Sequence, residues 1–236
     1  MTLRIDKLLS DSGIATRAGA RALVRAGRVA ADGRVVTRPE EKFDPSAADI
    51  RVDGAPLRPG GGRCFMLHKP AGVLSATEDG RDRTAVDLLP ESLRRLGLFP
   101  AGRLDKDSEG LLILTNDGQY CHNVISPRKN VEKVYYIETD RAMTAEDAEL
   151  FCTGAPLGGG ETARPAGLEL LDGNAALVTV TEGKFHQVKR MVKGAGKTVT
   201  YLKRLKIGGL ALDESLAPGE FKELSSEEAM SVFDGK

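Results

Sequence analysis

The first forty residues show apolar positions at helical spacing, followed by turn residues. The leading apolar positions that share one helix face are Ile5, Leu8 and Leu9. Gly13 ends this pattern, and Thr16 can cap a second helix that runs to Gly27, a residue type common just beyond helix ends. Residues 29–36 contain an Asp-Gly pair between two short apolar runs, which favours a β-hairpin. This segment therefore predicts a helix pair followed by a hairpin.

From Cys64 onward, short strand-like runs alternate with a few helical stretches. The runs typical of strands lie at 64–68, 111–115, 133–139, 176–181 and 198–202, and the helical stretches lie at 144–152 and 185–194. This mixture predicts an α+β fold built on a largely antiparallel mixed sheet with flanking helices. A glycine-rich segment at 58–63 is typical of a flexible linker. We therefore expect a small module over residues 1–60 and a larger domain over 64–236.

Composition places the chain among ordinary packed proteins. Its 236 residues are 41% hydrophobic, and no apolar run approaches the roughly 20 residues that cross a bilayer. We therefore expect a cytoplasmic protein with no membrane partner. The three cysteines and three histidines share no short spacing, so we expect neither a disulfide framework nor a bound metal.

The net charge is zero, but the charges are unevenly distributed. Residues 1–42 carry nine Lys or Arg against five acids, and residues 184–206 carry eight with no acid. On the second predicted helix, Arg17, Arg21 and Arg25 lie at i, i+4 and i+8. Like charges at this spacing cost about 0.2–0.5 kcal/mol per pair, so an anionic partner would relieve them. Two basic segments favour a polyanion, and a phosphate backbone is the natural one.

The polar loop before the apolar run Leu111–Leu114 contains the most informative residue, Asp105. The run is continuously apolar, as in a strand covered on both faces, and Asn116-Asp117-Gly118 closes it with turn residues. An Asp in such a loop is usually a turn or cap residue that binds nearby backbone N–H groups. Whether Asp105 is functional therefore has to be judged from the residues around it.

Those neighbours match a known family. Gly-Arg-Leu-Asp at 102–105, followed by Gly-Leu-Leu and Thr-Asn-Asp-Gly, resembles the central motif of the rRNA pseudouridine synthases of the RsuA type. Segments 126–135 and 182–191 resemble further motifs of that family in the same order, and 68–73 resembles its opening strand and turn. The helix pair with its arginines and the hairpin resemble an S4 RNA-binding module. The resemblance covers almost the whole chain and implies isomerisation of a uridine in ribosomal RNA.

The resemblance also implies roles for individual residues. Asp105 matches the catalytic aspartate, Tyr135 the tyrosine that packs on the target base, and Lys189 the cation that keeps the aspartate ionised, where many relatives have Arg. Arg103 is expected to fill the space left by the flipped-out base. Lys189 and Arg190 are adjacent on a predicted helix and project about 100° apart, so Arg190 is expected to face RNA phosphate. The isomerisation is redox-neutral, so no cofactor is expected.

Substrate choice and two other functions stay open. The segment His-Gln-Val-Lys-Arg at 186–190 favours the small-subunit 16S enzymes, and a large-subunit 23S enzyme is the alternative within the family. A non-catalytic RNA-binding assembly factor could keep the same fold. A carboxylate-dependent hydrolase would need a second acid, for which Asp107 or Glu109 are candidates. We expect a monomer that acts on ribosomal RNA or on an assembly intermediate.

Overall fold

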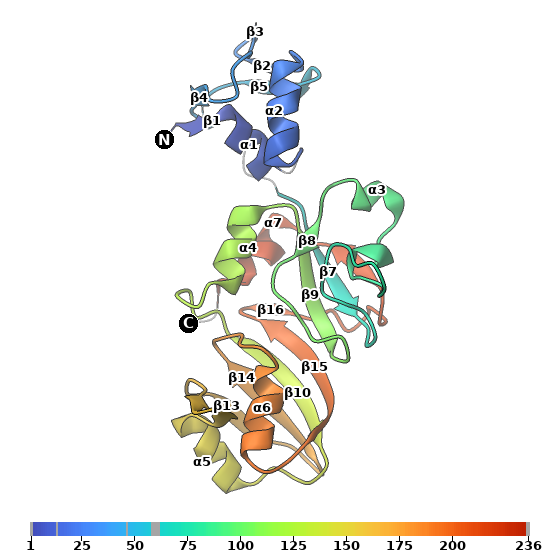
Figure 1. Cartoon of the computed structure of the whole chain (residues 1–236), viewed down its shortest axis with the longest axis vertical. Helices are drawn as coiled ribbons and strands as arrows, with labels where there is room; N and C mark the ends of the chain where they lie inside the picture. The colour runs from blue at the N-terminus through green and yellow to red at the C-terminus, as the bar shows by residue number, and fades with distance from the viewer. Residues whose placement is uncertain (1, 13, 46, 58–61, 235–236) are drawn as a thin grey trace.

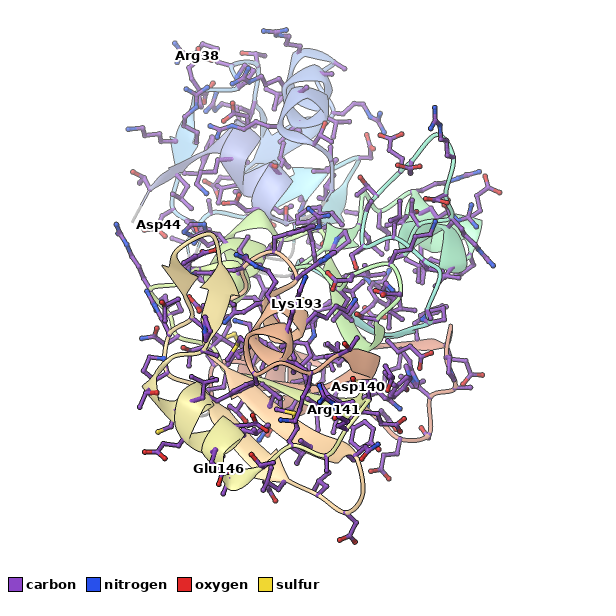
Figure 2. The ribbon with its side chains drawn as sticks, turned by 60° about the horizontal axis from the view of Figure 1, so that its bottom comes forward. Arg38, Asp44, Asp140, Arg141, Glu146 and Lys193 are labelled. Atoms are coloured by element: carbon purple, nitrogen blue, oxygen red, sulfur yellow. The ribbon has the colours of Figure 1, made fainter. Side chains whose placement is uncertain are left out.

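The computed structural model describes residues 2–12, 14–45, 47–57 and 62–234, which form an N-terminal module and a larger mixed α/β body (Figure 1). The predicted boundary at 58–63 falls mostly on residues 58–61, which lie outside the described residues. The division into 1–60 and 64–236 therefore stays a prediction. Charged side chains project outward from both parts, as Figure 2 shows for Arg38 in the N-terminal module and Glu146 in the body.

The N-terminal module contains the predicted helix pair and hairpin. Its elements are α1 (Ile5–Asp11), α2 (Arg17–Arg25), β1 (Leu3–Arg4) paired with β4 (Lys42–Phe43), and a sheet of order β3-β2-β5-β6 formed by β2 (Val29–Ala31), β3 (Arg34–Val35), β5 (Ile50–Val52) and β6 (Ala55–Pro56). The Thr16 side chain accepts a hydrogen bond from the Gly19 N–H and caps α2. Asp32 and Gly33 have φ of 51° and 76°, the conformation that a tight hairpin turn requires. Apolar residues of both helices and of the sheet share one core.

The body is built around a nine-stranded sheet, counted over the described residues. Its main order is β13-β14-β10-β15-β9-β7-β17, with β16 beside β15 and β8 beside β9. The strands are β7 (Cys64–Lys69), β8 (Phe99–Pro100), β9 (Glu109–Thr115), β10 (Lys133–Thr139), β13 (Gly167–Leu170), β14 (Ala175–Val180), β15 (Val199–Ile207), β16 (Leu210–Ala211) and β17 (Phe221–Glu223). Only the β9–β15 pairing is parallel among them, which confirms the predicted largely antiparallel mixed sheet.

Helices and short segments cover this sheet. They are α3 (Glu91–Arg94), α4 (Gly118–Ile125), α5 (Ala145–Thr153), α6 (Gln187–Gly194), α7 (Ser226–Ser231), the 3₁₀ turn η1 (Val86–Leu88) and the small hairpin of β11 (Pro156–Gly158) and β12 (Glu161–Thr162). None of the described helices combines the length and the apolar character that a membrane crossing requires. The helix predicted over 185–194 begins two residues later, because His186 has a left-handed backbone. The strand predicted over 198–202 continues to Ile207, because its basic residues pair with β9 and β10.

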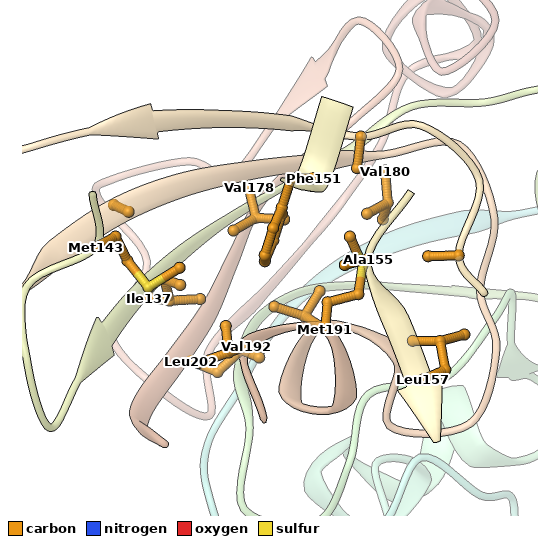
Figure 3. Close-up of a cluster of buried hydrophobic side chains, with 14 residues drawn as sticks. Ile137, Met143, Phe151, Ala155, Leu157, Val178, Val180, Met191, Val192 and Leu202 are labelled. Atoms are coloured by element: carbon orange, nitrogen blue, oxygen red, sulfur yellow. The ribbon is translucent and has the colours of Figure 1, made fainter. Parts of the chain in front are cut away.

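The body has separate hydrophobic cores on the two sides of the β9–β15 junction. Figure 3 shows the first, where Phe151 of α5 and Met191 of α6 pack against Ile137 and Val178 of the sheet. These four side chains are fully buried, and each contributes about 1.5–3 kcal/mol relative to exposure. On the other side, alternate residues of the apolar run 111–114 enter two different cores. The prediction of a strand covered on both faces is confirmed.

Candidate active site

The loop that carries Asp105 connects β8 to β9, close to the point where β9 pairs with β15. The two strands approach closely at Gly110, whose φ is +106°. A Cβ atom at this position would overlap the Arg204 backbone, so only glycine fits. The loop is thereby placed at the centre of the body, between its two sets of cores.

A buried lysine holds the lower part of this loop. The Nζ atom of Lys69, at the end of β7, donates to the carbonyl oxygens of Ser108 (2.7 Å), Pro70 (3.0 Å) and Lys106 (3.3 Å). Burial lowers the pKa of Lys69 to about 8, although Asp107, Asp105 and Glu109 act in the opposite direction. Lys69 therefore ties the end of β7 to the loop and gives the buried Ser108 carbonyl a donor.

The segment after Lys69 fixes the upper part of the loop. The Oγ atom of Ser75 donates to the Leu104 carbonyl (2.9 Å) and accepts from the Leu104 N–H (3.0 Å). The Gly72 N–H donates to the Lys106 carbonyl (2.7 Å). Segment 68–73, singled out in the sequence as the family's opening strand and turn, together with Ser75, thus positions the loop on both sides of Asp105.

The Asp105 carboxylate faces two cationic or titratable side chains. Its Oδ2 lies 3.1 Å from the Nζ of Lys189, and its Oδ1 lies 3.4 Å from the Nε2 of His186. Lys189 also contacts the Oδ1 of Asp107 at 2.5 Å, and this hydrogen bond is the largest cause that holds the pKa of Asp107 below its ordinary value. Burial works against the charge on Lys189, but the bonds to Asp107 and Asp105 outweigh it and raise the pKa of the lysine.

One cleft brings four of the predicted site residues together. Its lining includes Arg103, Asp105, Tyr135 and Lys189, together with His186. The Asp105 side chain is 25% exposed, so a ligand in the cleft can reach a carboxylate that is partly desolvated. A larger cavity lies between α4 and residues 230–233. The carboxylate that lines it, Asp117, accepts the N–H groups of Gln119 and Tyr120 through Oδ1 as the cap of α4, which is a structural role.

Tyr135 enters the cleft from β10 and is backed by an arginine that the sequence analysis did not single out. The guanidinium of Arg204 lies 6.0 Å from the centre of the Tyr135 ring, and its Nη1 is 3.5 Å from the Tyr135 hydroxyl. Arg204 is 3% exposed and donates through Nε to the Leu111 carbonyl at 2.8 Å. Its Nη2 is buried without a partner in the described part of the chain. The alternating pattern of β15 did not indicate that Arg204 is buried, because a basic side chain in a strand normally faces solvent.

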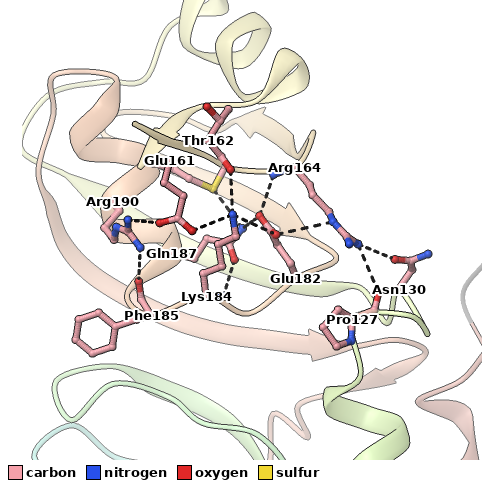
Figure 4. Close-up of polar contacts among 11 residues, drawn as sticks. Pro127, Asn130, Glu161, Thr162, Arg164, Glu182, Lys184, Phe185, Gln187 and Arg190 are labelled. Carbon is pink, nitrogen blue, oxygen red and sulfur yellow. Dashed lines mark hydrogen bonds and ion pairs between the residues drawn. The ribbon is translucent and has the colours of Figure 1, made fainter. Parts of the chain in front are cut away.

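The N-terminal end of α6 is held by a polar network around the buried Glu182 (Figure 4). The Oε1 atom of Glu182 accepts from the side chain of Gln187 (2.8 Å) and from the Arg164 N–H (2.9 Å). Arg164 also donates to the Asn130 side chain at 3.2 Å. The motif segments 126–135 and 182–191 therefore meet through Arg164, and this contact fixes the helix that carries Lys189.

The predicted RNA contacts fall into two groups. Arg103 is exposed, lines the cleft and has no ion-pair partner within the described ranges. Arg190, in contrast, donates through Nε to the Leu157 carbonyl (2.9 Å) and pairs through Nη2 with Glu161 (2.5 Å). Its predicted contact with RNA phosphate stays untested, and its donors already have protein acceptors.

The arginines of α2 also differ from one another. Arg17 and Arg21 reach back to Asp6 of α1 at 3.5 and 3.0 Å, where Arg4 binds as well, and the Asp6 side chain is 0% exposed. Burial would raise the pKa of Asp6, but the hydrogen bonds from Arg4 and Arg21 outweigh it and lower that pKa. The Asp6 carboxylate thus supplies, within the protein, part of the negative charge that the arginines were expected to find in an anionic partner. Arg25 has no partner among the described residues, and its role as an RNA contact stays a prediction.

Comparison with known proteins agrees with this geometry. A model of the RNA pseudouridylate synthase family matches residues 63–194, and a model of the S4 domain matches residues 3–48. The uncharacterized RNA pseudouridine synthase YtzG of Bacillus subtilis is 46% identical over 230 residues, which cover 96% of each chain. Ribosomal small subunit pseudouridine synthase A of Escherichia coli K12 is 38% identical over 98% of this chain and 100% of its own. A crystal structure of a pseudouridylate synthase superposes with a TM-score of 0.70 at 33% identity, over 98% of this chain and 99% of that one. The chain therefore belongs to the RNA pseudouridylate synthase family, with an S4 domain at its N-terminal end.

Proposed function

We propose that this protein isomerises one uridine of small-subunit 16S ribosomal RNA to pseudouridine, with Asp105 as the nucleophile. The observation that carries the proposal is the cleft in which the Asp105 carboxylate lies 3.1 Å from Lys189 and shares its walls with Tyr135. Relatives named ribosomal small subunit pseudouridine synthase A are 38–40% identical over nearly the whole chain, which supports the choice of subunit.

The reaction makes specific demands on the cleft. The bond from the sugar C1′ to uracil N1 must break, the base must turn, and C1′ must bond to C5, which loses its hydrogen as a proton while N1 gains one. Electrons and atoms balance within the uridine, so no oxidant or cofactor is consumed. A carboxylate that forms a covalent intermediate divides this exchange into easier steps. Lys189, 3.1 Å from the Asp105 carboxylate, can hold that carboxylate in position for attack.

Tyr135 and Arg103 fit the base-flipping part of the reaction. Taking a base out of its stack costs a few kcal/mol, and contacts in the pocket must offset this cost. The Tyr135 ring offers an aromatic face to the uracil, and the Arg204 guanidinium behind it holds the ring in place. The Arg103 side chain has no hydrogen-bond or ion-pair partner in the described part of the chain, so its planar guanidinium is available to occupy the vacated space.

The hydrolase alternative is less well supported. Glu109, one candidate second acid, accepts a hydrogen bond from the Tyr201 hydroxyl at 2.8 Å. Asp107, the other, is 75% exposed and bound to Lys189. Neither lines the cleft, whereas a general acid must reach the bond that it protonates. We also propose that the substrate is ribosomal RNA or an assembly particle in the cytoplasm, and that the protein acts as a monomer.

The test compares two carboxylates that contact the same lysine. With 16S rRNA carrying tritium at uridine C5, Asp105→Asn should lower tritium release by about 10³-fold or more, because the nucleophile is lost. Asp107→Asn should stay within about tenfold of the wild type, because Asp107 only assists in placing Lys189. RNA affinity should be similar in both variants. Substantial turnover by Asp105→Asn, or an equal loss in both, would overturn the assignment.

The substrate is tested with unmodified 16S and 23S transcripts and with small-subunit assembly particles. We expect tritium release from 16S rRNA, free or in particles, and none above background from 23S rRNA. Release from 23S rRNA alone would transfer the proposal to the large subunit. No release from any of these substrates would favour the non-catalytic assembly factor.

A further inference from the structure

Phe185 is the most exposed of the large hydrophobic side chains that the structure describes as exposed. It is 72% exposed and directly precedes His186 at the start of α6. Isolated apolar residues are common on protein surfaces and by themselves indicate nothing. The surroundings of Phe185 distinguish it from the other exposed residues.

The Phe185 ring lies on the imidazole ring of His186. The two ring centres are 3.8 Å apart and their planes differ by 16°. The Nε2 atom of the same imidazole lies 3.4 Å from the Asp105 carboxylate, and His186 lines the cleft. His186 therefore contacts the candidate nucleophile through Nε2 and the Phe185 ring through its face. The Phe185 ring lies outside the lining of the cleft and is mostly exposed to solvent.

The turn that presents this ring is fixed by the protein. The Nη1 of Arg190 donates to the Phe185 carbonyl at 3.3 Å, while its Nη2 is held by Glu161. The Gln187 side chain accepts from the Lys184 N–H at 2.9 Å on the other side of the turn. In Figure 4 the Phe185 ring points away from this network, so its exposure does not result from a loose loop. A ring already held in position loses little conformational freedom when a ligand packs on it.

The backbone of this turn is itself unusual. His186 has φ of 48°, one of four non-glycine residues with positive φ in the described chain. Such a conformation costs a non-glycine residue of order 1 kcal/mol or more. It lies at the residue whose imidazole lines the cleft and stacks on the Phe185 ring.

We propose that Phe185 stacks on an unpaired RNA base next to the target uridine, as an outer subsite of the cleft. This inference rests on the proposed function, because a flipped-out uridine leaves its neighbours without a stacking partner. Aromatic side chains bind single-stranded bases through such stacking, with little preference for base identity. The subsite would thus hold the flanking strand in place while Tyr135 and Asp105 act on the uridine.

The test uses the full-length protein and a hexauridylate in which one internal residue is 2-aminopurine, whose fluorescence falls when it stacks. Phe185→Ala should weaken binding by about 5- to 150-fold and remove the quenching. Phe185→Trp should retain both, whereas Phe185→Leu should lose the quenching, because an aliphatic chain lacks a π face. Met230→Ala is the matched control, since Met230 is also an exposed apolar residue and lies on α7. Equal quenching in wild type and Phe185→Ala, or none in wild type, would overturn the proposal.

Activity on C5-tritiated 16S rRNA separates this inference from the proposed function. Phe185→Ala should raise KM about tenfold or more with a smaller change in kcat, because Phe185 contacts a flanking base and not the reacting atoms. If the wild type releases tritium and Phe185→Ala has the same KM, the subsite is wrong while the function stands. If the wild type quenches the probe through Phe185 but releases no tritium, the function is wrong while base stacking stands.

Discussion

Lys189 contacts two carboxylates, and the positions of those carboxylates suggest different roles for them. Asp105 lines the cleft at 3.1 Å from Lys189, and Asp107 lies outside the cleft at 2.5 Å. Asp107 can therefore hold Lys189 in place, while the positive charge of the lysine lies beside Asp105. The ion pairs raise the pKa of Lys189, so the lysine stays charged throughout the neutral range.

We expect Lys189→Met to lower kcat by about 10²-fold, because the cation that lies 3.1 Å from the Asp105 carboxylate is lost. Lys189→Arg should restore most of the rate, because it keeps a cation at this position. Lys193→Met removes a charge from the exposed face of the same helix and should leave kcat unchanged (Figure 2). A Lys189→Met variant with the wild-type kcat would contradict the role of this lysine.

At the scale of elements, the end of β7 fixes the Asp105 loop through a single buried amine. Replacing Lys69 by Met removes a donor from the Ser108 and Pro70 carbonyls, whereas the Lys106 carbonyl keeps its bond from the Gly72 N–H. We expect a loss of about 2–3 kcal/mol in the free energy of unfolding at pH 7. Lys106→Met is the control, because the Lys106 side chain is nearly half exposed and pairs only with Asp82 in the described chain. Denaturant titrations of the three proteins measure these differences.

The same lysine predicts a pH dependence of stability. The pKa of Lys69 is lowered to about 8 in the folded state from 10.5, so between these values the unfolded chain binds the additional proton. Stability increases with pH wherever the unfolded state binds more protons. The stability difference between wild type and Lys69→Met should therefore be constant below about pH 8 and increase from there toward pH 10.5. Parallel curves of unfolding free energy against pH for the two proteins would show that burial does not lower the pKa of Lys69.

At the scale of the whole molecule, the arginines of α2 have different roles: Arg17 and Arg21 stabilise the N-terminal module, and Arg25 has no partner in the described chain. We expect Arg25→Gln to weaken rRNA binding and to reduce the slope of log K against log salt by about 0.7–0.9, the value for one lost phosphate contact. Its melting temperature should not change, because Arg25 has no partner in the described chain. Arg21→Gln should in addition lose about 1 kcal/mol of stability, because the buried Asp6 loses a partner.

The control for the salt experiment is Arg95→Gln, which removes an exposed arginine on the C-terminal side of α3, outside both basic segments. It should change neither the salt slope nor the affinity. If Arg25→Gln binds like the wild type with the same slope, the S4 module does not contact RNA through this face of α2. The loss of activity expected in Arg25→Gln should appear in KM more than in kcat, since phosphate contacts set register and affinity.

Local features of the sequence were sufficient to determine several elements. The Asp-Gly hairpin, the Thr16 cap and the covered strand at 111–114 follow from backbone preferences and from side-chain periodicity over a few residues. The motif around Asp105 indicated the candidate carboxylate through its resemblance to the rRNA pseudouridine synthases. These features depend on interactions over short sequence distances, which a linear pattern can show.

Which charges meet depends on how the helices and strands pack together. Arg17 and Arg21 read as free cations along the helix, but Asp6 comes close to them when α1 packs on α2. Arg204 reaches the Tyr135 hydroxyl only because β15 lies beside β10 in the sheet. An ion pair or hydrogen bond requires atoms about 3 Å apart, and its partners here are 11 to 69 residues apart in the chain. Hydrophobic periodicity does not specify such distant pairs, so they follow from the packing of the elements.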